Sequence, residues 1–330
     1  MKPLKSRVFS APADVLSWLG RHGKKAVAAS VVIGIALPSV GAVFKPHITG
    51  VVFALLCLAF VRVDVAALKG YLHRPVTVIA ATAWTSVAVP LIFGAGCRLL
   101  RLDQIASDLF LGFMLQAIAS PLMAAPALAA LMGLDATLVL VTLVASTAVI
   151  PLTAPFFALV FVGPALSISP TALGVKLFAI LSGAALSGMV LRRFVGLAAI
   201  ERHADEINGL NVIVLFVFAL AIMESVGARF LADPAITLAI ASLAFIVFFA
   251  LLFLTAVLFL SAGKRRAFAL GFMASQRNMG LMLAATGGAL PELTWLYFAL
   301  SQLPIYLSPQ LLQPIVRKLL ENDSDGDAPE

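Results

Sequence analysis

Long, nearly uninterrupted apolar runs alternate with short polar spacers along most of the chain. Many of these runs reach the roughly 20 residues that an α-helix needs to cross the hydrocarbon core of a bilayer. The strands of a membrane β-barrel would instead alternate apolar and polar residues. The pattern therefore predicts ten membrane-spanning helices, at residues 26–43, 48–66, 76–97, 105–131, 136–162, 171–191, 207–228, 235–261, 265–287 and 292–316.

Composition supports an all-α polytopic membrane protein. The 330 residues are 62% hydrophobic and 12% charged, whereas soluble domains carry about 25% charged residues. The two cysteines and four histidines do not cluster at the spacing of metal ligands, so we expect neither a metal site nor a cofactor. A phosphate-binding G-x-x-x-x-G-K-[ST] string is absent from the sequence, so transport energy would have to come from a gradient.

The placement of the basic residues predicts the topology. With ten spans, seventeen Lys and Arg residues fall on one side of the membrane and four on the other. Lys and Arg accumulate in cytoplasmic loops, so this asymmetry puts both termini in the cytoplasm of a multi-pass cell or inner membrane protein. Topology thus accounts for the net charge of +7, and nucleic acid is not expected as a partner.

Two segments in different halves of the chain are similar. Residues 111–126 read LGFMLQAIASPLMAAP and residues 270–285 read LGFMASQRNMGLMLAA, with seven of sixteen positions identical. The ends match, whereas the middle contains polar residues and a helix breaker, Pro121 in one copy and Gly280 in the other. Interrupted apolar helices in corresponding halves are the usual sequence signal of a transporter binding site.

The two segments belong to the fourth and the ninth span. Because each half holds five spans, the second half would enter the membrane from the opposite face, which makes the halves an inverted repeat. We predict a first repeat at 26–163 and a second at 164–318, with broken fourth and ninth helices that cross near the bilayer centre. Residues 1–25 would be a cytoplasmic segment with an interfacial helix, and 319–330 a disordered acidic tail.

The polar residues at the two breaks are the candidate substrate site. They are Gln116, Ser120, Pro121, Gln276, Arg277 and Asn278. Arg277 lies twelve residues into the ninth span, about 18 Å deep, where an arginine costs about 2.5–3.5 kcal/mol or more. Its guanidinium would bind an anionic substrate group or occupy the place of a cation. The alternative is a structural ion pair with Glu224 of the seventh span.

Hydroxyl and amide groups near the breaks form a candidate ion site. It comprises Ser146 and Thr147 of the fifth span together with Ser275 and Gln276 of the ninth. Such hydroxyl groups often bond only to their own helix or to a neighbouring helix, so a packing role stays open for them. Na⁺ would be the coupling ion at such a site.

The chain resembles the bile acid:sodium symporter family over residues 26–318. The resemblance is carried by RVDVAALKGYLHRP (62–75), ASPLMAAPALAALMGLDATLVL (119–140) and QRNMGLM (276–282), whose Asn-x-Gly-Leu string is similar to the ninth-helix signature of the family. It implies ten helices in two inverted repeats, with unwound fourth and ninth helices. The chain departs from the family at Met273, where the sodium-binding Glu belongs, and at Arg277, where a Gln belongs. Sodium coupling is therefore expected to be weakened or lost.

Taken together, the sequence predicts a secondary active transporter that moves a small organic anion across the bilayer by alternating access. A passive channel or uniporter of the same fold remains the alternative. An intramembrane enzyme is disfavoured, because a membrane aspartyl protease needs two apposed carboxylates. The acidic candidates, Asp108 and Glu224, both lie near span ends.

Overall fold

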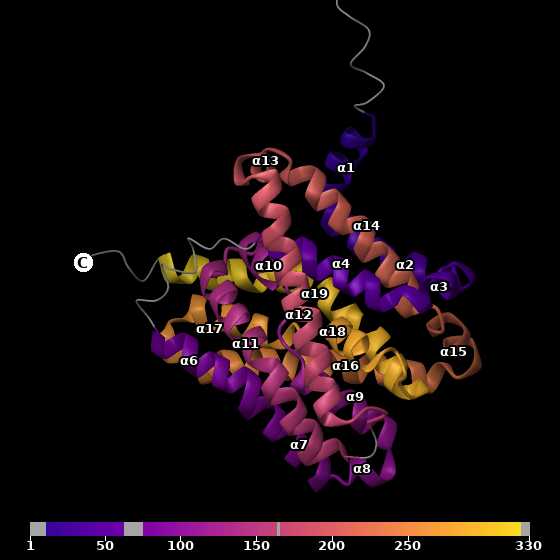
Figure 1. Cartoon of the computed structure of the whole chain (residues 1–330). Helices are drawn as coiled ribbons and strands as arrows, with labels where there is room; N and C mark the ends of the chain where they lie inside the picture. Colours follow the sequence, from indigo (N-terminus) through magenta and orange to yellow (C-terminus); the bar gives the residue numbers. More distant parts are fainter. Residues whose placement is uncertain (1–10, 63–74, 164–165, 325–330) are drawn as a thin grey trace, which may run out of the picture. The chain divides into compact units, whose positions relative to one another are not determined.

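The computed structural model describes residues 11–62, 75–163 and 166–324, and these are almost entirely helical (Figure 1). Within these ranges the one extended pairing is an isolated β-bridge. Six helical stretches are long and apolar enough to cross a membrane, and the prediction of an all-α membrane protein is confirmed at this level. They are Pro38–Val61, Pro75–Leu99, Ala136–Val162, Pro170–Val195, Ala204–Ala232 and Pro234–Leu258.

The described residues of the predicted spans are mostly helical. Four predicted spans, 26–43, 105–131, 265–287 and 292–316, do not coincide with any of the six long apolar stretches, so the number of ten spans stays a prediction. The largest difference concerns the first two. The first span is interrupted at Leu37, because the residue before a proline avoids the helical conformation. The spacer Lys45–His47 forms a 3-10 turn instead of a loop, so Pro38–Val61 is a continuous helical stretch.

Contacts divide the chain into two compact units, and each unit takes segments from both halves of the sequence. The first unit comprises Met1–Val63 and Ile180–Ala232, and the second comprises Asp64–Ala179 and Asp233–Glu330. The boundary passes through the long helix α12 (Pro170–Val195).

In the first unit, α14 packs against each of the four helices at the start of the chain (Figure 1). The helices of this unit, besides the second part of α12, are α1 (Ala11–Arg21), α2 (Gly23–Ala36), α3 (Pro38–Phe44), α4 (Ile48–Val61), α13 (Leu197–Arg202), α14 (Ala204–Met223) and α15 (Val226–Ala232). Glycines permit the close approach, since a Cβ at Gly209 would collide with the backbone of Leu16. Helix α1 lies in the first 25 residues, where an interfacial helix is predicted, and its position at a membrane interface stays a prediction.

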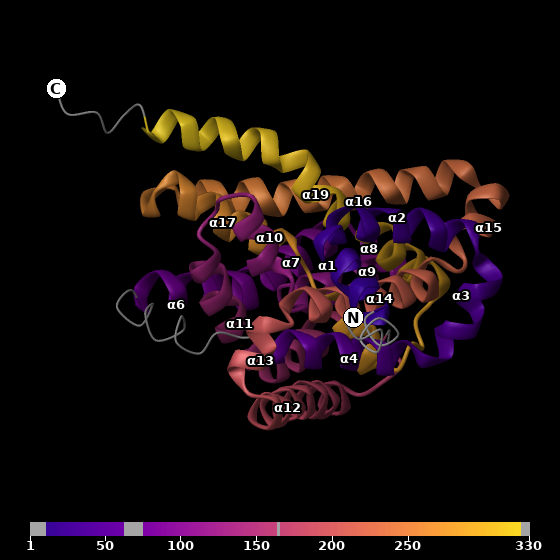
Figure 2. The same cartoon turned by 90° about the horizontal axis from the view of Figure 1, so that it is seen from above.

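In the second unit, the long helix α16 (Pro234–Leu258) lies beside α17 and α19 (Figure 2). The other helices, besides the first part of α12, are α6 (Pro75–Ala83), α7 (Val89–Leu99), α8 (Leu102–Ile105), α9 (Ser107–Ile118), α10 (Ala125–Leu131), α11 (Ala136–Phe157), α17 (Lys264–Ser275), α18 (Met279–Thr286) and α19 (Glu292–Ser324). Between α6 and α7, the π-helical turn η4 (Trp84–Ala88) keeps the chain continuous, and a second π-helical turn, η5 (Ala158–Val162), extends α11.

The core of the second unit joins helices that are far apart in sequence. Val89 of α7, Ala117 of α9 and Leu251 of α16 form one buried apolar cluster. Trp84 packs against this cluster and donates from its indole Nε1 to the hydroxyl of Thr255 on α16 at 2.9 Å. The end of α9 therefore packs against α7, from the first half of the chain, and against α16, from the second half.

The glycine shared by the two similar segments serves close helix packing in both copies. A Cβ at Gly112 would lie 3.0 Å from the ring of Tyr297 on α19, and a Cβ at Gly271 would collide with the carbonyl oxygen of Leu252 on α16. Small residues at helix interfaces allow backbones to approach closely. This explains why a glycine occupies the same place in each segment.

At the end of the chain, α19 continues to Ser324, which is further than the tenth span predicted. The sequence predicts a disordered acidic tail from residue 319, whereas residues 319–324 are helical. Residues 325–330 lie outside the described ranges.

The packing of Gly271 yields a stability prediction. Gly271→Ala should lower the free energy of unfolding by about 1–3 kcal/mol, because the added methyl group must displace the backbone of α16. Gly96→Ala in α7 is the matched control, since among the described residues no heavy atom lies within 4 Å of a Cβ built there. Thermal unfolding of the detergent-solubilised protein should show a lower midpoint for Gly271→Ala alone.

Candidate functional site

The two interrupted helices break close to equivalent points, as the sequence predicted. In the fourth span, α9 ends at Ile118 and α10 begins at Ala125. In the ninth span, α17 ends at Ser275 and α18 begins at Met279. Both α9 and α17 have 12 residues, so each break follows about 18 Å of helix.

The two breaks meet directly within the second unit. The backbone N–H of Leu122 donates to the carbonyl of Gln276 at 2.7 Å, and the N–H of Asn278 donates to the carbonyl of Ser120 at 2.8 Å. Together they form an antiparallel bridge that pairs Pro121 with Arg277. Each break thereby satisfies backbone groups that the other has released, as any interrupted helix in a membrane interior requires.

Pro121 both ends α9 and suits the bridge. Its ring nitrogen has no hydrogen to donate, so the helical ladder cannot continue through it. In the bridge, the hydrogen bonds involve the neighbours on either side, Ser120 and Leu122. Pro121 therefore occupies the non-hydrogen-bonded position of the antiparallel pair, where a missing N–H has no cost.

The second break ends at Asn278 and not at Gly280. The side-chain oxygen of Asn278 accepts a hydrogen bond from the N–H of Leu281 at 3.0 Å and so caps the first turn of α18. Gly280, which the sequence suggested as the breaker, lies inside α18 and is buried. The polar triplet before it, residues 276–278, is the interrupted part.

Arg277 is buried at the crossing, with only 1% of its surface exposed. Its Nη1 donates to the carbonyl of Ala119 at 2.9 Å and to the carbonyl of Thr85 at 3.2 Å. Ala119 directly follows the last residue of α9 and has an extended conformation. One nitrogen of the guanidinium thus joins the second break to the first break and to the turn η4.

Pro90 explains why the carbonyl of Thr85 is available to Arg277. In the π-helical turn η4, the N–H of Val89 donates to the carbonyl of Trp84, five residues earlier. The next N–H along the chain would bond the carbonyl of Thr85, but residue 90 is a proline and has none. Arg277 supplies the missing donor.

The other two nitrogens of this guanidinium have no hydrogen-bond partner among the described residues, although both are buried. Nε–H and one Nη2–H lie on the same edge of the planar group. That edge is the one that binds both oxygens of a single carboxylate. Arg277 is therefore anchored through Nη1 and has an unpartnered two-donor edge.

Glu224 has a different partner from the one considered in the sequence. Its Oε2 accepts from Nζ of Lys45 at 2.9 Å, and both residues belong to the first unit. The hydrogen bonds of Arg277 go to backbone carbonyls of the second unit instead. Within the described part of the chain, the buried cation is consequently held by carbonyl dipoles and not by a carboxylate.

The two glutamines of the site each bond a side chain of α19. The hydroxyl of Tyr297 donates to Oε1 of Gln116, and Nε2 of Gln276 donates to the hydroxyl of Ser308 at 2.7 Å. In the described part of the chain, Oε1 of Gln276 and the hydroxyl of Ser120 remain buried without a partner. The first break thus offers a hydroxyl, which can donate or accept, and the second break offers an acceptor oxygen.

Residues of the candidate ion site have mixed environments. The hydroxyl of Ser275 donates to the carbonyl of Phe272 in its own helix at 2.8 Å. Ser146 and Thr147 are buried in α11, and no described residue bonds their hydroxyls. The same holds for Thr142, one turn earlier on α11. No hydrogen bond joins Ser146 or Thr147 to the other described site residues.

Sequence reasoning missed the supporting residues Thr85, Tyr297 and Ser308. One signal could have indicated the first of them, since Pro90 sits inside an otherwise apolar span and must free a carbonyl one turn earlier. Tyr297 and Ser308 are polar residues of the tenth span that only the packing of α19 brings to the glutamines.

No family model matches the chain, and no curated protein matches it significantly. Of the three segments that carry the family resemblance, 119–140 covers the first break, α10 and the start of α11, and 276–282 covers the second break and the start of α18. The segment 62–75 lies almost wholly outside the described residues.

The bond between Tyr297 and Gln116 can be tested through stability. Tyr297→Phe should reduce the free energy of unfolding by about 1–3 kcal/mol, because it leaves the buried Oε1 of Gln116 without a donor. Tyr306→Phe, on the same helix, removes a hydroxyl that bonds no described residue, and it should have a smaller effect. Equal thermal unfolding midpoints for the two variants would contradict the prediction.

Proposed function

We propose that this chain is a secondary active transporter that carries a small organic anion by alternating access, with the anion bound at the crossing of the two broken helices. The free edge of Arg277 is the observation that carries the proposal. A carboxylate placed against Nε and Nη2 would receive two parallel charge-assisted hydrogen bonds. The hydroxyl of Ser120 lies in the facing break and offers a further donor.

Charge balance favours an anion at this site. A buried cation is costly unless an opposite charge compensates it, and among the described residues Arg277 has only carbonyl oxygens as partners. An anionic group would restore neutrality at a place where backbone dipoles already orient the guanidinium. The anionic group of the substrate would thus form an ion pair with the guanidinium of Arg277.

Sodium coupling has weaker support. Met273, where the resembling family carries a carboxylate, is an apolar residue with 1% exposure. Hard cations such as Na⁺ prefer oxygen ligands with compensating negative charge. The side-chain oxygens of Ser146, Thr147 and Gln276 have no hydrogen-bond partner among the residues that the structure describes. The positive charge of Arg277, however, adjoins Gln276 in the chain. We propose that Arg277 replaces one bound cation.

The inverted repeat is supported by the way in which the units are built. Each unit combines an early segment with a later one, so that the fourth and ninth spans come together in the second unit. Ten spans with both termini in the cytoplasm remain the topology that best fits the distribution of basic residues.

A substitution at Arg277 tests the anion site. The purified protein would be screened by thermal shift against radiolabelled pyruvate, succinate and benzoate, and the stabilising anion used for uptake into proteoliposomes. Arg277→Lys should raise the KM for that anion at least tenfold, because an ammonium group keeps the charge but cannot supply the two-donor edge. Arg98→Lys is the matched control, since Arg98 also donates to a backbone carbonyl, that of Val160, but is exposed.

Two results would contradict this proposal. One is an unchanged KM in Arg277→Lys with a normal unfolding midpoint, and the other is failure of every tested anion to enter proteoliposomes that contain folded protein. Uptake that never exceeds the external concentration under any imposed proton, sodium or voltage gradient would favour the channel or uniporter.

Sodium dependence gives a separate prediction. With the membrane potential clamped, uptake of the anion should change less than about twofold when an inward sodium gradient replaces an equal choline gradient. The reason is the fixed cation at the crossing, which repels a second positive charge. A steep rise of uptake with the sodium gradient would show that Arg277 does not substitute for the coupling ion.

A further inference from the structure

An open pocket of about 670 Å³ lies at the far end of α17 from the crossing. It is lined by two connections of the second unit, the one between α10 and α11 and the one between α16 and α17. Since α17 has 12 residues, the pocket lies about 18 Å along that helix from the second break. It is therefore distinct from the site of Arg277.

Positive charge dominates the lining. The charged residues of the lining are Lys264, Arg265, Arg266 and one carboxylate, Asp135, so its formal charge is +2. The first turns of α11 and α17 also line the pocket. The positive ends of two helix dipoles add to the attraction for an anion.

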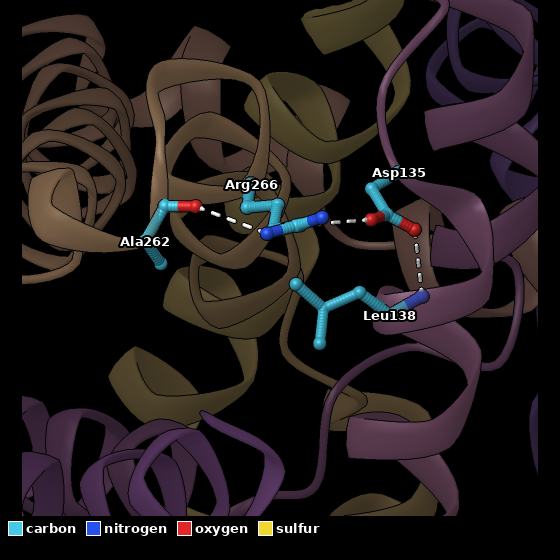
Figure 3. Close-up of polar contacts among 4 residues, drawn as sticks. All are labelled: Asp135, Leu138, Ala262 and Arg266. Atoms are coloured by element: carbon cyan, nitrogen blue, oxygen red, sulfur yellow. Dashed lines mark hydrogen bonds and ion pairs between the residues drawn. The ribbon is translucent and has the colours of Figure 1, made fainter. Parts of the chain in front are cut away.

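Asp135 is already engaged in holding the two connections together (Figure 3). Its carboxylate accepts from the N–H of Leu138 at 3.0 Å and lies 3.6 Å from Nε of Arg266. Arg266 in turn donates from Nη1 to the carbonyl of Ala262 at 3.5 Å. Lys264 and Arg265, the other two basic residues of the lining, are both exposed.

Exposed apolar side chains precede the lining residues on both connections. Val257 and Leu258 in the last turn of α16 are 64% and 52% exposed, and Leu260 in the following turn is 53% exposed. On the other side, Leu131 at the end of α10 is 48% exposed. An apolar surface next to a basic pocket is expected where the hydrocarbon region of a bilayer gives way to the headgroups.

We infer that this pocket binds the phosphate of an anionic phospholipid, whose acyl chains lie against the exposed apolar end of α16. The same cations would attract a soluble phosphate or carboxylate, but the apolar rim favours a ligand with a hydrocarbon tail. The predicted topology puts this end of α17 at the cytoplasmic leaflet, where anionic lipids provide about 1 kcal/mol of attraction per basic residue. The inference does not depend on the proposed transport.

Lipid binding to the delipidated, full-length protein in detergent tests the inference. Short-chain phosphatidylglycerol would be titrated into the protein and followed by native mass spectrometry. We expect a bound phosphatidylglycerol molecule that added phosphatidylcholine does not displace. The double variant Lys264→Gln/Arg265→Gln should bind phosphatidylglycerol about thirtyfold more weakly, as expected for the loss of two attractive charges. Arg317→Gln/Lys318→Gln removes two exposed charges of α19 outside the pocket and should change the affinity less than twofold.

Competition with inorganic phosphate distinguishes a lipid phosphate from a soluble anion as the ligand of this pocket. Inorganic phosphate should compete poorly with phosphatidylglycerol, because it lacks the acyl chains. Competition at comparable concentrations would show that the pocket takes a soluble anion, and an unchanged lipid affinity in the pocket variant would show that the pocket is not the lipid site. Should the double variant unfold, the single variants Lys264→Gln and Arg265→Gln carry the same test.

Discussion

The second unit depends on one constraint, which is that every backbone polar group released in the middle of an apolar layer must find a partner. Two helices break at similar depth, and each supplies what the other lacks through the bridge between Pro121 and Arg277. The guanidinium of Arg277 then satisfies two further carbonyls, at Ala119 and at Thr85. The side chain of Arg277 thus bonds the first break and the turn η4, while the second break is held by the backbone hydrogen bonds of the bridge.

The location of the breaks could be predicted from the sequence, because the causes are local. Pro121 cannot continue a helix, and a polar triplet at residues 276–278 cannot remain in an apolar span without partners. The similarity of the two segments added the expectation that the breaks correspond. The breaker in the second segment was predicted wrongly, since Gly280 is accommodated within α18 and Asn278 restarts the helix by capping it.

The partners of the site residues could not be predicted, because they are set by tertiary packing. For Arg277 the sequence suggested an anionic substrate group, the place of a cation or an ion pair with Glu224. It did not indicate the two carbonyls that Arg277 bonds, which are freed by the end of α9 at Ala119 and by Pro90 in another helix. Tyr297 reaches Gln116 from a helix 181 residues further along the chain. Glu224, which sequence reasoning considered for Arg277, is matched with Lys45 in the first unit. Hydropathy alone does not determine such pairings.

The charge of Arg277 has an electrostatic consequence for any ion at the crossing. Two unit charges about 5 Å apart interact with about 3 kcal/mol at an effective dielectric constant near 20, which corresponds to more than a hundredfold in affinity. The binding of a sodium ion at that distance from the guanidinium would be weakened by this factor, and the binding of a carboxylate would be strengthened by a similar one. Since Met273 is apolar and buried, the charge of Arg277 would favour an anion over a cation at the crossing before any detail of the ligand's shape matters.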